Sequence, residues 1–246
     1  GRGIGDLLDL TVSRLASLPE TAPAVKEDLD KEIIKVAIVG RPNVGKSTLI
    51  NKLGDKALSL VSSMPGTTRD IVKTDIPTGN DKIIRLIDTA GLRRAGKIEK
   101  GIEKFSSLLV IKAVSEADLV LLVVDGSDGI MSQDLHITQI ILEAKVGVIM
   151  VINKWEAVDK TPSITAEFDK YLDQKFVFMP WLPKVYVSAL TGQRTQNILT
   201  EITNVWDSLH TKIPAKELNN IVAEAIATHP PRGRRKPPKI YFSHQI

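Results

Sequence analysis

A glycine-rich run with an adjoining lysine and hydroxyl, GRPNVGKS at residues 40–47, has the residue types and spacing for phosphate chemistry. It matches the phosphate-binding loop pattern, in which glycines let backbone N–H groups turn towards a phosphate. In such a loop Lys46 reaches the β- and γ-phosphates, and the Ser47 hydroxyl is a ligand to Mg²⁺. A strand-like run precedes the loop and a helix-like segment, Thr48 to Leu53, follows it, as the pattern requires. The sequence therefore predicts a binding site for a nucleoside phosphate.

Two later segments have the composition of a nucleotide-dependent switch. The sequence DTAG occupies residues 88–91, where Asp88 would hold the Mg²⁺ shell and the Gly91 N–H would contact the γ-phosphate. The sequence PGTTRD occupies residues 65–70, where Thr68 would complete the Mg²⁺ coordination when the γ-phosphate is present. Loss of that phosphate would release both segments, so their order along the chain predicts the order–disorder switch of GTPases.

The sequence NKWE at residues 153–156 predicts the contact with the base. Asn153 can donate to N7 of a purine, and the Lys154 stem can lie across the ring. Glu156 can accept hydrogen bonds from guanine N1–H and the exocyclic amine, which adenine does not present in that arrangement. The backbone of residues 188–190 can donate to guanine O6. Aspartate is the expected acid at position 156, so the longer glutamate predicts guanine preference with weakened affinity.

The predicted nucleotide contacts come from four segments of the chain. They are Gly40, Arg41, Pro42, Asn43, Val44, Gly45, Lys46, Ser47, Thr48, Asp88, Thr89, Ala90, Gly91, Leu92, Asn153, Lys154, Trp155, Glu156, Ser188, Ala189 and Leu190. Within this set and the switch segment, Ser47, Thr68 and Asp88 are the expected Mg²⁺ ligands. Lys46, Thr68 and Gly91 are expected to take part in the reaction.

The elements that must position these loops alternate between strand-like and helix-like patterns. Strands are expected at 33–39, 70–77, 82–87, 119–124, 147–152 and 184–187, and helices at 102–115, 132–145, 163–175 and 195–210. This alternation predicts an α/β fold with a mostly parallel, doubly wound sheet. A turn signal at residues 78–81 joins the second and third strands and predicts one antiparallel pair.

Composition and charge narrow the class of protein. The 246 residues are 43% hydrophobic and 25% charged, as in an ordinary globular protein with a core of stable size. The absence of cysteine excludes a disulfide framework and a thiol nucleophile and fits a reducing compartment. The apolar run Leu119 to Val124 is far shorter than the roughly 20 residues of a membrane span, so we expect no membrane contact.

The positive charge is concentrated at the C-terminal end. Residues 212–246 contain seven basic and two acidic residues, whereas the whole chain has a net charge of +4. A basic end on a near-neutral body indicates either a polyanionic partner or a solvated basic loop.

Residues 35–211 resemble the second GTPase domain of the EngA (Der) double-GTPase family. Beyond the shared loops, the resemblance rests on GLRR at residues 91–94, EKFS at 103–106, the Pro-Trp pair at 180–181 and VSALTGQ at 187–193. It implies a P-loop NTPase fold of the Ras-like GTPase kind, with GTP or GDP and Mg²⁺ as cofactors. It also implies a cytoplasmic, monomeric, GTP-hydrolysing switch that acts in assembly of the large ribosomal subunit.

The same resemblance divides the chain into parts. Residues 1–18 resemble the last loop and helix of the family's first GTPase domain, which would be a partner in cis, and residues 19–34 look like a linker. Residues 212–246 look like the start of a truncated, α+β KH-like domain. A KH module grips RNA with a GxxG loop, and this segment contains only Gly233. Its basic stretch, 232–239, could instead contact rRNA phosphates without sequence specificity, or face the neighbouring GTPase domain.

The expected rate of hydrolysis depends on two positions. Leu92 stands where many GTPases have a glutamine that orients water, which predicts slow turnover without help. Asn43 resembles the asparagine that coordinates K⁺ in related GTPases, and this implies a K⁺ ion as the aid to catalysis. Arg69, Arg93 and Arg94 are candidate arginine fingers that we expect not to act as such.

Three alternatives share parts of this pattern. The first is a nucleotide-gated ribosome-binding module with negligible turnover, which Leu92 keeps open. The second is an ATP-using phosphoryl-transfer enzyme, which only Glu156 favours. The third is another P-loop GTPase of the Era or tRNA-modification type, against which the segment at residues 1–18 argues.

Overall fold

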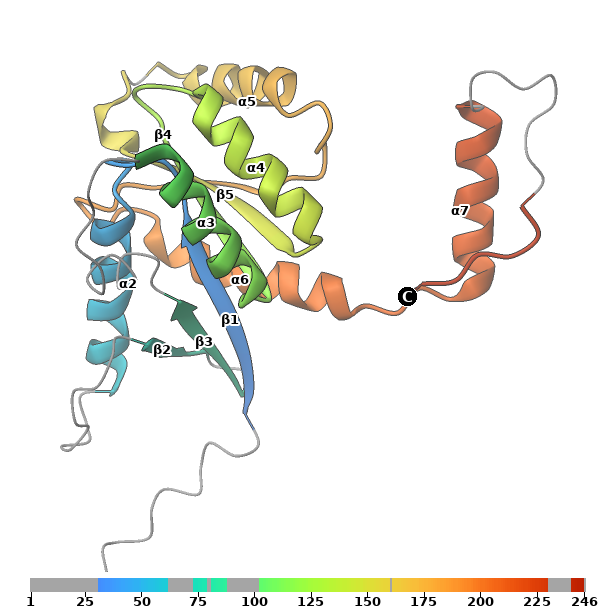
Figure 1. The fold of residues 1–246 in the computed structure, drawn as a ribbon, viewed down its shortest axis with the longest axis horizontal. Coiled ribbons are helices and arrows are strands. Elements are labelled where there is room, and N and C mark those ends of the chain that lie inside the picture. Colours follow the sequence, from blue (N-terminus) through green and yellow to red (C-terminus); the bar gives the residue numbers. More distant parts are fainter. Residues whose placement is uncertain are drawn as a thin grey trace, which may run out of the picture.

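The computed structural model of the chain describes residues 31–61, 73–78, 81–87, 102–159, 161–229 and 240–245. Its centre is a six-stranded sheet with the order β2-β3-β1-β4-β5-β6 (Figure 1). The strands are β1 (Glu32–Val39), β2 (Lys73–Pro77), β3 (Lys82–Ile87), β4 (Leu119–Asp125), β5 (Gly147–Asn153) and β6 (Lys184–Tyr186). All neighbouring strands are parallel except β2, which pairs antiparallel with β3. The sheet therefore has the predicted architecture.

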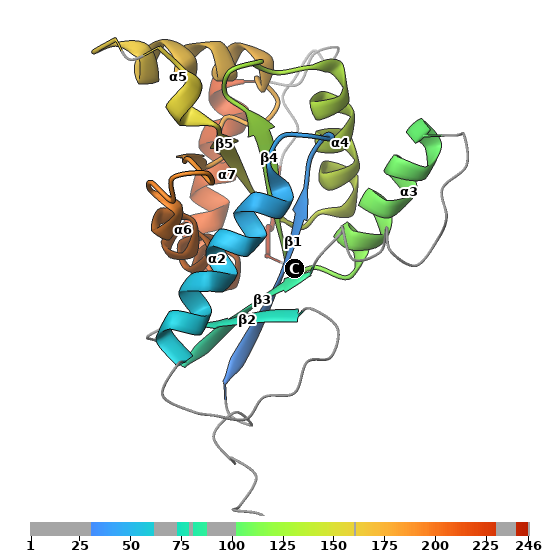
Figure 2. The same cartoon turned by 90° about the vertical axis from the view of Figure 1, so that its left-hand side faces the viewer.

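Helices cover both faces of this sheet (Figure 2). They are α2 (Lys46–Val61), α3 (Ile102–Ser115), α4 (Ser132–Ala144), α5 (Ile164–Lys175) and α6 (Thr195–His210). Apolar residues of α2 and α6 pack on one face, and those of α3, α4 and α5 pack on the other. Burial on both faces explains why the central strands read as continuous apolar runs rather than alternating ones. In β4, LVLLVVD, every residue is buried.

The predicted elements agree with the structure except at their ends. Helix α2 extends to Val61, eight residues beyond the predicted end, since Gly54 does not interrupt it. Strand β2 begins at Lys73 in the described part, and β6 ends at Tyr186 rather than Val187. These differences leave the loops that follow β1, β4, β5 and β6 at the same edge of the sheet.

A last helix, α7 (Ala215–Thr228), stands apart from the sheet and its covering helices (Figure 1). None of its residues is buried. The segment 240–245 lies against it, because the Ser243 N–H donates to Asn219 Oδ1 over 2.7 Å. The assignment of residues 212–246 to a KH-like domain stays a prediction, and the basic stretch 232–239 and residues 1–18 lie outside the described residues. No helix in the described part combines the length and apolar character that crossing a membrane requires.

Candidate nucleotide-binding site

The phosphate loop lies between β1 and α2 and has a backbone that its glycines permit. Gly40 has φ +149° and Gly45 has φ +96°, conformations that side chains rarely adopt. A Cβ on Gly40 would overlap the Val123 carbonyl oxygen, and one on Gly45 would overlap the Asn153 amide. Asn43 also has a left-handed backbone, with φ 65°, which asparagine tolerates better than most residues. The loop is therefore packed tightly against the ends of β4 and β5.

Lys46 closes the phosphate loop through its side chain. Its Nζ donates to the carbonyl oxygens of Gly40 and Arg41 over 2.7 and 2.6 Å. The side chain thus lies across the mouth of the loop, where it would meet phosphate oxygens. Ser47 and Thr48, at the start of α2, are exposed, as are Pro42 and Asn43, whereas Val44 is buried.

Asn153, the last residue of β5, joins three loops. Its Nδ2 donates to the Val44 carbonyl over 2.8 Å, and its Oδ1 accepts from the Ala189 N–H over 2.9 Å. Its side chain is thereby buried between the phosphate loop and the loop after β6. One N–H of Nδ2 remains to meet the base, so the predicted contact with purine N7 is chemically available.

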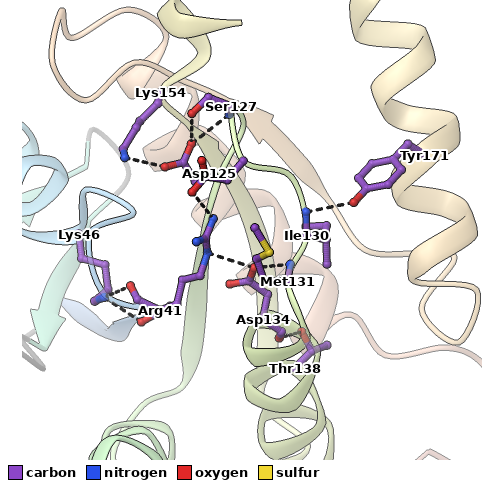
Figure 3. Close-up of polar contacts among 12 residues, drawn as sticks. Arg41, Lys46, Asp125, Ser127, Ile130, Met131, Asp134, Thr138, Lys154 and Tyr171 are labelled. Atoms are coloured by element: carbon purple, nitrogen blue, oxygen red, sulfur yellow. Dashed lines mark hydrogen bonds and ion pairs between the residues drawn. The ribbon is translucent and has the colours of Figure 1, made fainter. Parts of the chain in front are cut away.

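Lys154 is held by an acidic residue that ends β4. Lys154 Nζ lies 2.5 Å from Asp125 Oδ2, and the other oxygen of Asp125 accepts from Ser127 N–H and Oγ (Figure 3). Burial acts to raise the pKa of Asp125, but the hydrogen bonds from Lys154 and Ser127 outweigh it, and the pKa is lowered overall. The carboxylate is therefore charged and gives Lys154 a fixed partner.

Residues 155–157 form a short 3-10 helix, and the side chain of its first residue, Trp155, packs into the core. Trp155 is buried, with its ring 4.5 Å from that of Tyr186 and 5.4 Å from that of Phe168. Its backbone N–H donates to the Val187 carbonyl over 3.1 Å. Glu156, one residue further on, is exposed. Glu156 is therefore an exposed residue that directly follows the anchored tryptophan, in the segment predicted to contact the base.

The loop after β6 is fixed by its own serine. Ser188 is buried, and its Oγ accepts from the Thr191 N–H over 3.0 Å. Ala189 is buried beside it, whereas Leu190 is 72% exposed. The described structure therefore brings together three predicted segments: residues 40–48, 153–156 and 188–190.

Arg41 ties the phosphate loop to the start of α4. Its guanidinium lies 3.0 Å from Asp128 Oδ2 and 3.4 Å from Asp134 Oδ2. Asp134 also accepts from the Met131 N–H over 3.0 Å and is fully buried (Figure 3). Burial raises the pKa of Asp134, with Met131 and Arg41 acting against it.

Sequence reasoning assigned no role to the acidic residues at the end of β4 and on the segment that follows it. Asp125, Asp128 and Asp134 do not belong to a contiguous motif, and their basic partners are distant in the sequence. The one local signal is Asp125 itself, a charged residue that ends an otherwise apolar, buried strand.

The switch residues lie outside the described residues. They are Thr68, Asp88, Thr89, Ala90, Gly91 and Leu92, together with Arg69, Arg93 and Arg94. Their assigned roles stay predictions.

Comparisons with known proteins show which family the chain resembles. Residues 35–154 match a family profile described as "50S ribosome-binding GTPase". The GTPase Der of Chloroflexus aggregans is 44% identical over 237 residues, which cover 96% of this chain and 51% of that protein. The GTPase Der of a Thermoanaerobacter species is 38% identical over 247 residues, covering 100% of this chain and 54% of that protein. The chain thus spans about half the length of these curated relatives.

Solved structures show the same fold. The structure of Era with MgGDPNP and nucleotides 1506–1542 of 16S ribosomal RNA has a TM-score of 0.55 and 28% identity, covering 71% of this chain and 57% of that one. The structure of a variant of Aquifex aeolicus Era bound to GDP·AlF4⁻ has a TM-score of 0.55 and 30% identity, over the same shares of the two chains. The fold is therefore that of the P-loop GTPases.

Proposed function

The chain belongs to the Der (EngA) type of GTPases, and from this we propose that it binds and hydrolyses GTP as a molecular switch in assembly of the large ribosomal subunit. One observation carries most of the proposal. The Asn153 side chain bonds at once to the phosphate loop and to the loop after β6, which supports a single site built from the segments predicted to read phosphate and base. A phosphate loop without a base site would not need this junction.

The phosphate end of the site suits a nucleotide with Mg²⁺. Helix α2 begins at Lys46, so its first N–H groups and its dipole favour phosphate at that position. The exposed Ser47 hydroxyl is a hard oxygen donor of the kind that Mg²⁺ accepts together with phosphate oxygens. Ser47 would hold the ion with Thr68 and Asp88, and bound Mg²⁺ would neutralise charge on the β- and γ-phosphates.

We assign the remaining stabilisation of the transition state to a K⁺ ion held by Asn43. Because Leu92 carries no group that can orient water, hydrolysis needs positive charge or positioning from another source. Asn43 is an exposed residue of the phosphate loop. Bound K⁺ would supply positive charge where negative charge develops between the β- and γ-phosphates. Lys46 contributes the second fixed charge there.

The base end of the site favours guanine. Asn153 retains a donor for purine N7, and the exposed Glu156 carboxylate can accept from both guanine donors. The backbone of residues 188–190 would lie near guanine O6, with the Ala189 N–H already donated to Asn153 Oδ1. An adenine nucleotide would leave the Glu156 carboxylate without donors, which argues against the ATP-using alternative.

A ribosomal partner is the second half of the proposal. The matching family is described as ribosome-binding, and Era was solved with 16S ribosomal RNA. The seven basic residues of segment 212–246 would add contacts to rRNA phosphates, and a preceding GTPase domain would be the partner in cis.

Turnover of GTP by this chain tests the proposal against a binding module without turnover. Phosphate release is measured with Mg²⁺ in KCl and in NaCl of equal concentration, with and without large ribosomal subunits. We expect release to be at least tenfold faster in KCl and faster again with subunits. Asn43→Ala is the matched variant and should remove the difference between KCl and NaCl. Absence of turnover under all four conditions would favour the binding module.

A further inference from the structure

We infer that Asp125 is a positioning residue for recognition of the base, because it fixes the Lys154 side chain in the site before a nucleotide binds. The inference rests on the proposed function, since it assigns a role within the same nucleotide site. Lys154 would contact the ring directly, whereas Asp125 would act only through Lys154.

The position of Asp125 in the sheet suits this role. It is the last residue of β4 and pairs in register with Asn153, the last residue of β5. Its side chain is 3% exposed, although a carboxylate is rarely buried unless it is paired. The other six residues of β4 are apolar, so packing alone does not explain an acid at this place.

The two oxygens of Asp125 have different partners. Oδ1 accepts from the Ser127 backbone N–H over 3.0 Å and from Ser127 Oγ over 2.6 Å. Oδ2 lies 2.5 Å from Lys154 Nζ (Figure 3). Because Ser127 fixes the orientation of the carboxylate, Oδ2 is a stationary anchor for the lysine.

Both ends of the Lys154 side chain are therefore held. Its backbone has φ 59° and ψ 31°, a left-handed conformation that is unfavourable for a residue with a Cβ. The bonds of Asn153 and the buried ring of Trp155 hold that backbone on either side. Asp125 then holds the Nζ end. The side chain between these two points is 36% exposed, which leaves methylene groups available to a flat ring.

This arrangement lowers the entropic cost of binding a nucleotide. A free lysine side chain has many rotamers, and ordering it against a ligand opposes binding. Because the ion pair already orders Lys154 in the free protein, the side chain loses little conformational entropy when the nucleotide binds. The effect should act on ligands that carry a base and spare ligands that are phosphate alone.

The test compares GDP with inorganic pyrophosphate in the variant Asp125→Asn. The amide is isosteric and its oxygen can still accept from Ser127, but it cannot pair with Lys154 as an anion. We expect the affinity for GDP to fall about tenfold. Affinity for pyrophosphate should change less than about twofold. An equal loss for both ligands, or no loss for GDP, would overturn the inference.

A double-mutant cycle shows whether Asp125 acts through Lys154. In a chain that already carries Lys154→Ala, Asp125→Asn should cause no further loss of GDP affinity. A further loss of about tenfold in that background would mean that Asp125 acts independently, and would overturn the inference.

Asp128→Asn is the matched control. Asp128 lies on the same segment but pairs with Arg41 in the phosphate loop, and its side chain is 50% exposed. Its replacement should leave the ratio of GDP to pyrophosphate affinity unchanged. If the unmodified chain binds neither ligand, the proposed function fails. If it binds both and the ratio does not respond to Asp125→Asn, only this inference fails.

Discussion

The base-reading loop, residues 153–156, and the phosphate loop, residues 40–47, both follow buried parallel strands, yet different contacts hold them in shape. In the base-reading loop the side chains of Asn153, Lys154 and Trp155 each have partners from other strands or loops. The phosphate loop takes its shape mainly from its own backbone, with Gly40 and Gly45 at positive φ and Lys46 bonded to loop carbonyls. The pairing of Arg41 with Asp128 and Asp134 adds a side-chain contact with a distant segment.

This difference reflects what each loop recognises. A phosphate accepts hydrogen bonds from any direction, so a ring of backbone N–H groups beside one lysine is sufficient. A base has a fixed pattern of donors and acceptors along its edge, so the recognising side chains must be held at fixed angles. We therefore expect truncation of Asn153 in the base-reading loop to affect folding and binding together, and truncation of Lys46 in the phosphate loop to affect mainly binding.

The largest effect is expected for Asn153→Ala. The substitution leaves the buried Val44 carbonyl and Ala189 N–H without their partner, so the free energy of unfolding should fall by about 2–3 kcal/mol. Urea denaturation measures this change, and titration with a fluorescent GDP analogue should show that binding is lost as well. Leu190→Ala, at a residue that is 72% exposed, is the control and should change stability little. Unchanged stability for Asn153→Ala would contradict the proposed difference between the two loops.

Lys46→Ala should separate binding from folding. The affinity for GTP should fall by a factor of about 100 or more, equivalent to about 2.7 kcal/mol, because the charge that meets the phosphates is gone. The free energy of unfolding should change by less than about 1 kcal/mol, since the side-chain bonds to Gly40 and Arg41 connect residues of the same loop. Isothermal titration and urea denaturation measure the two quantities. A loss of stability as large as that of Asn153→Ala would show that the two loops are not different.

The pH dependence of two carboxylates sharpens the comparison further. The pKa of Asp125 lies below its ordinary value of 3.8, so its contribution to stability is present above that value and is lost as the pH falls through the lowered pKa. The pKa of Asp134 lies above 3.8, because burial disfavours its charged form, so ionisation of Asp134 reduces stability as the pH rises through the raised pKa. Carboxyl carbon NMR should place the two titrations on opposite sides of 3.8. Acid unfolding of Asp125→Asn should accordingly be less steep than that of the unmodified chain. A shift of both titrations in one direction would contradict this assignment.

The smallest effect is expected for Glu156→Asp. Glu156 is exposed, so its replacement should leave stability within about 0.5 kcal/mol. The shorter side chain should meet the guanine edge better and raise the affinity for GDP about threefold, roughly 0.6 kcal/mol. Competition between GDP and ADP measures the gain. A decrease in GDP affinity would show that the loop is built for the longer acid.

The two loops also differ in how well the sequence predicts them, because one depends on local backbone and the other on contacts with distant elements. The place of the phosphate loop between β1 and α2 could be predicted, because the loop depends on local backbone conformation and contiguous residue types, and the roles of its residues in binding stay predictions. The parallel strands and the antiparallel β2 also followed from local patterns. The extent of α2 did not, since tertiary packing keeps the helix intact beyond Gly54.

The partners of the base-reading loop could not be predicted in this way. Asp125 and Lys154 are brought together by the pairing of β4 with β5, and Arg41 and Asp134 by the packing of α4 beside the phosphate loop. Such contacts depend on register and packing between distant elements, and apart from the acid that ends the apolar strand β4 the sequence contains no local signal for them. The predicted roles of Thr68 and Asp88 lie outside the described residues and stay predictions.

The measurement that tests the central claim most directly is competition of GTP, ATP and XTP for this chain in the presence of Mg²⁺. We predict that GTP binds more tightly than either competitor by a factor of about 100 or more, equivalent to about 2.7 kcal/mol. That result would show that Asn153, Lys154 and Glu156 read guanine as a fixed unit. Equal competition by the three nucleotides would contradict the account, because the site would then bind phosphates without reading the base.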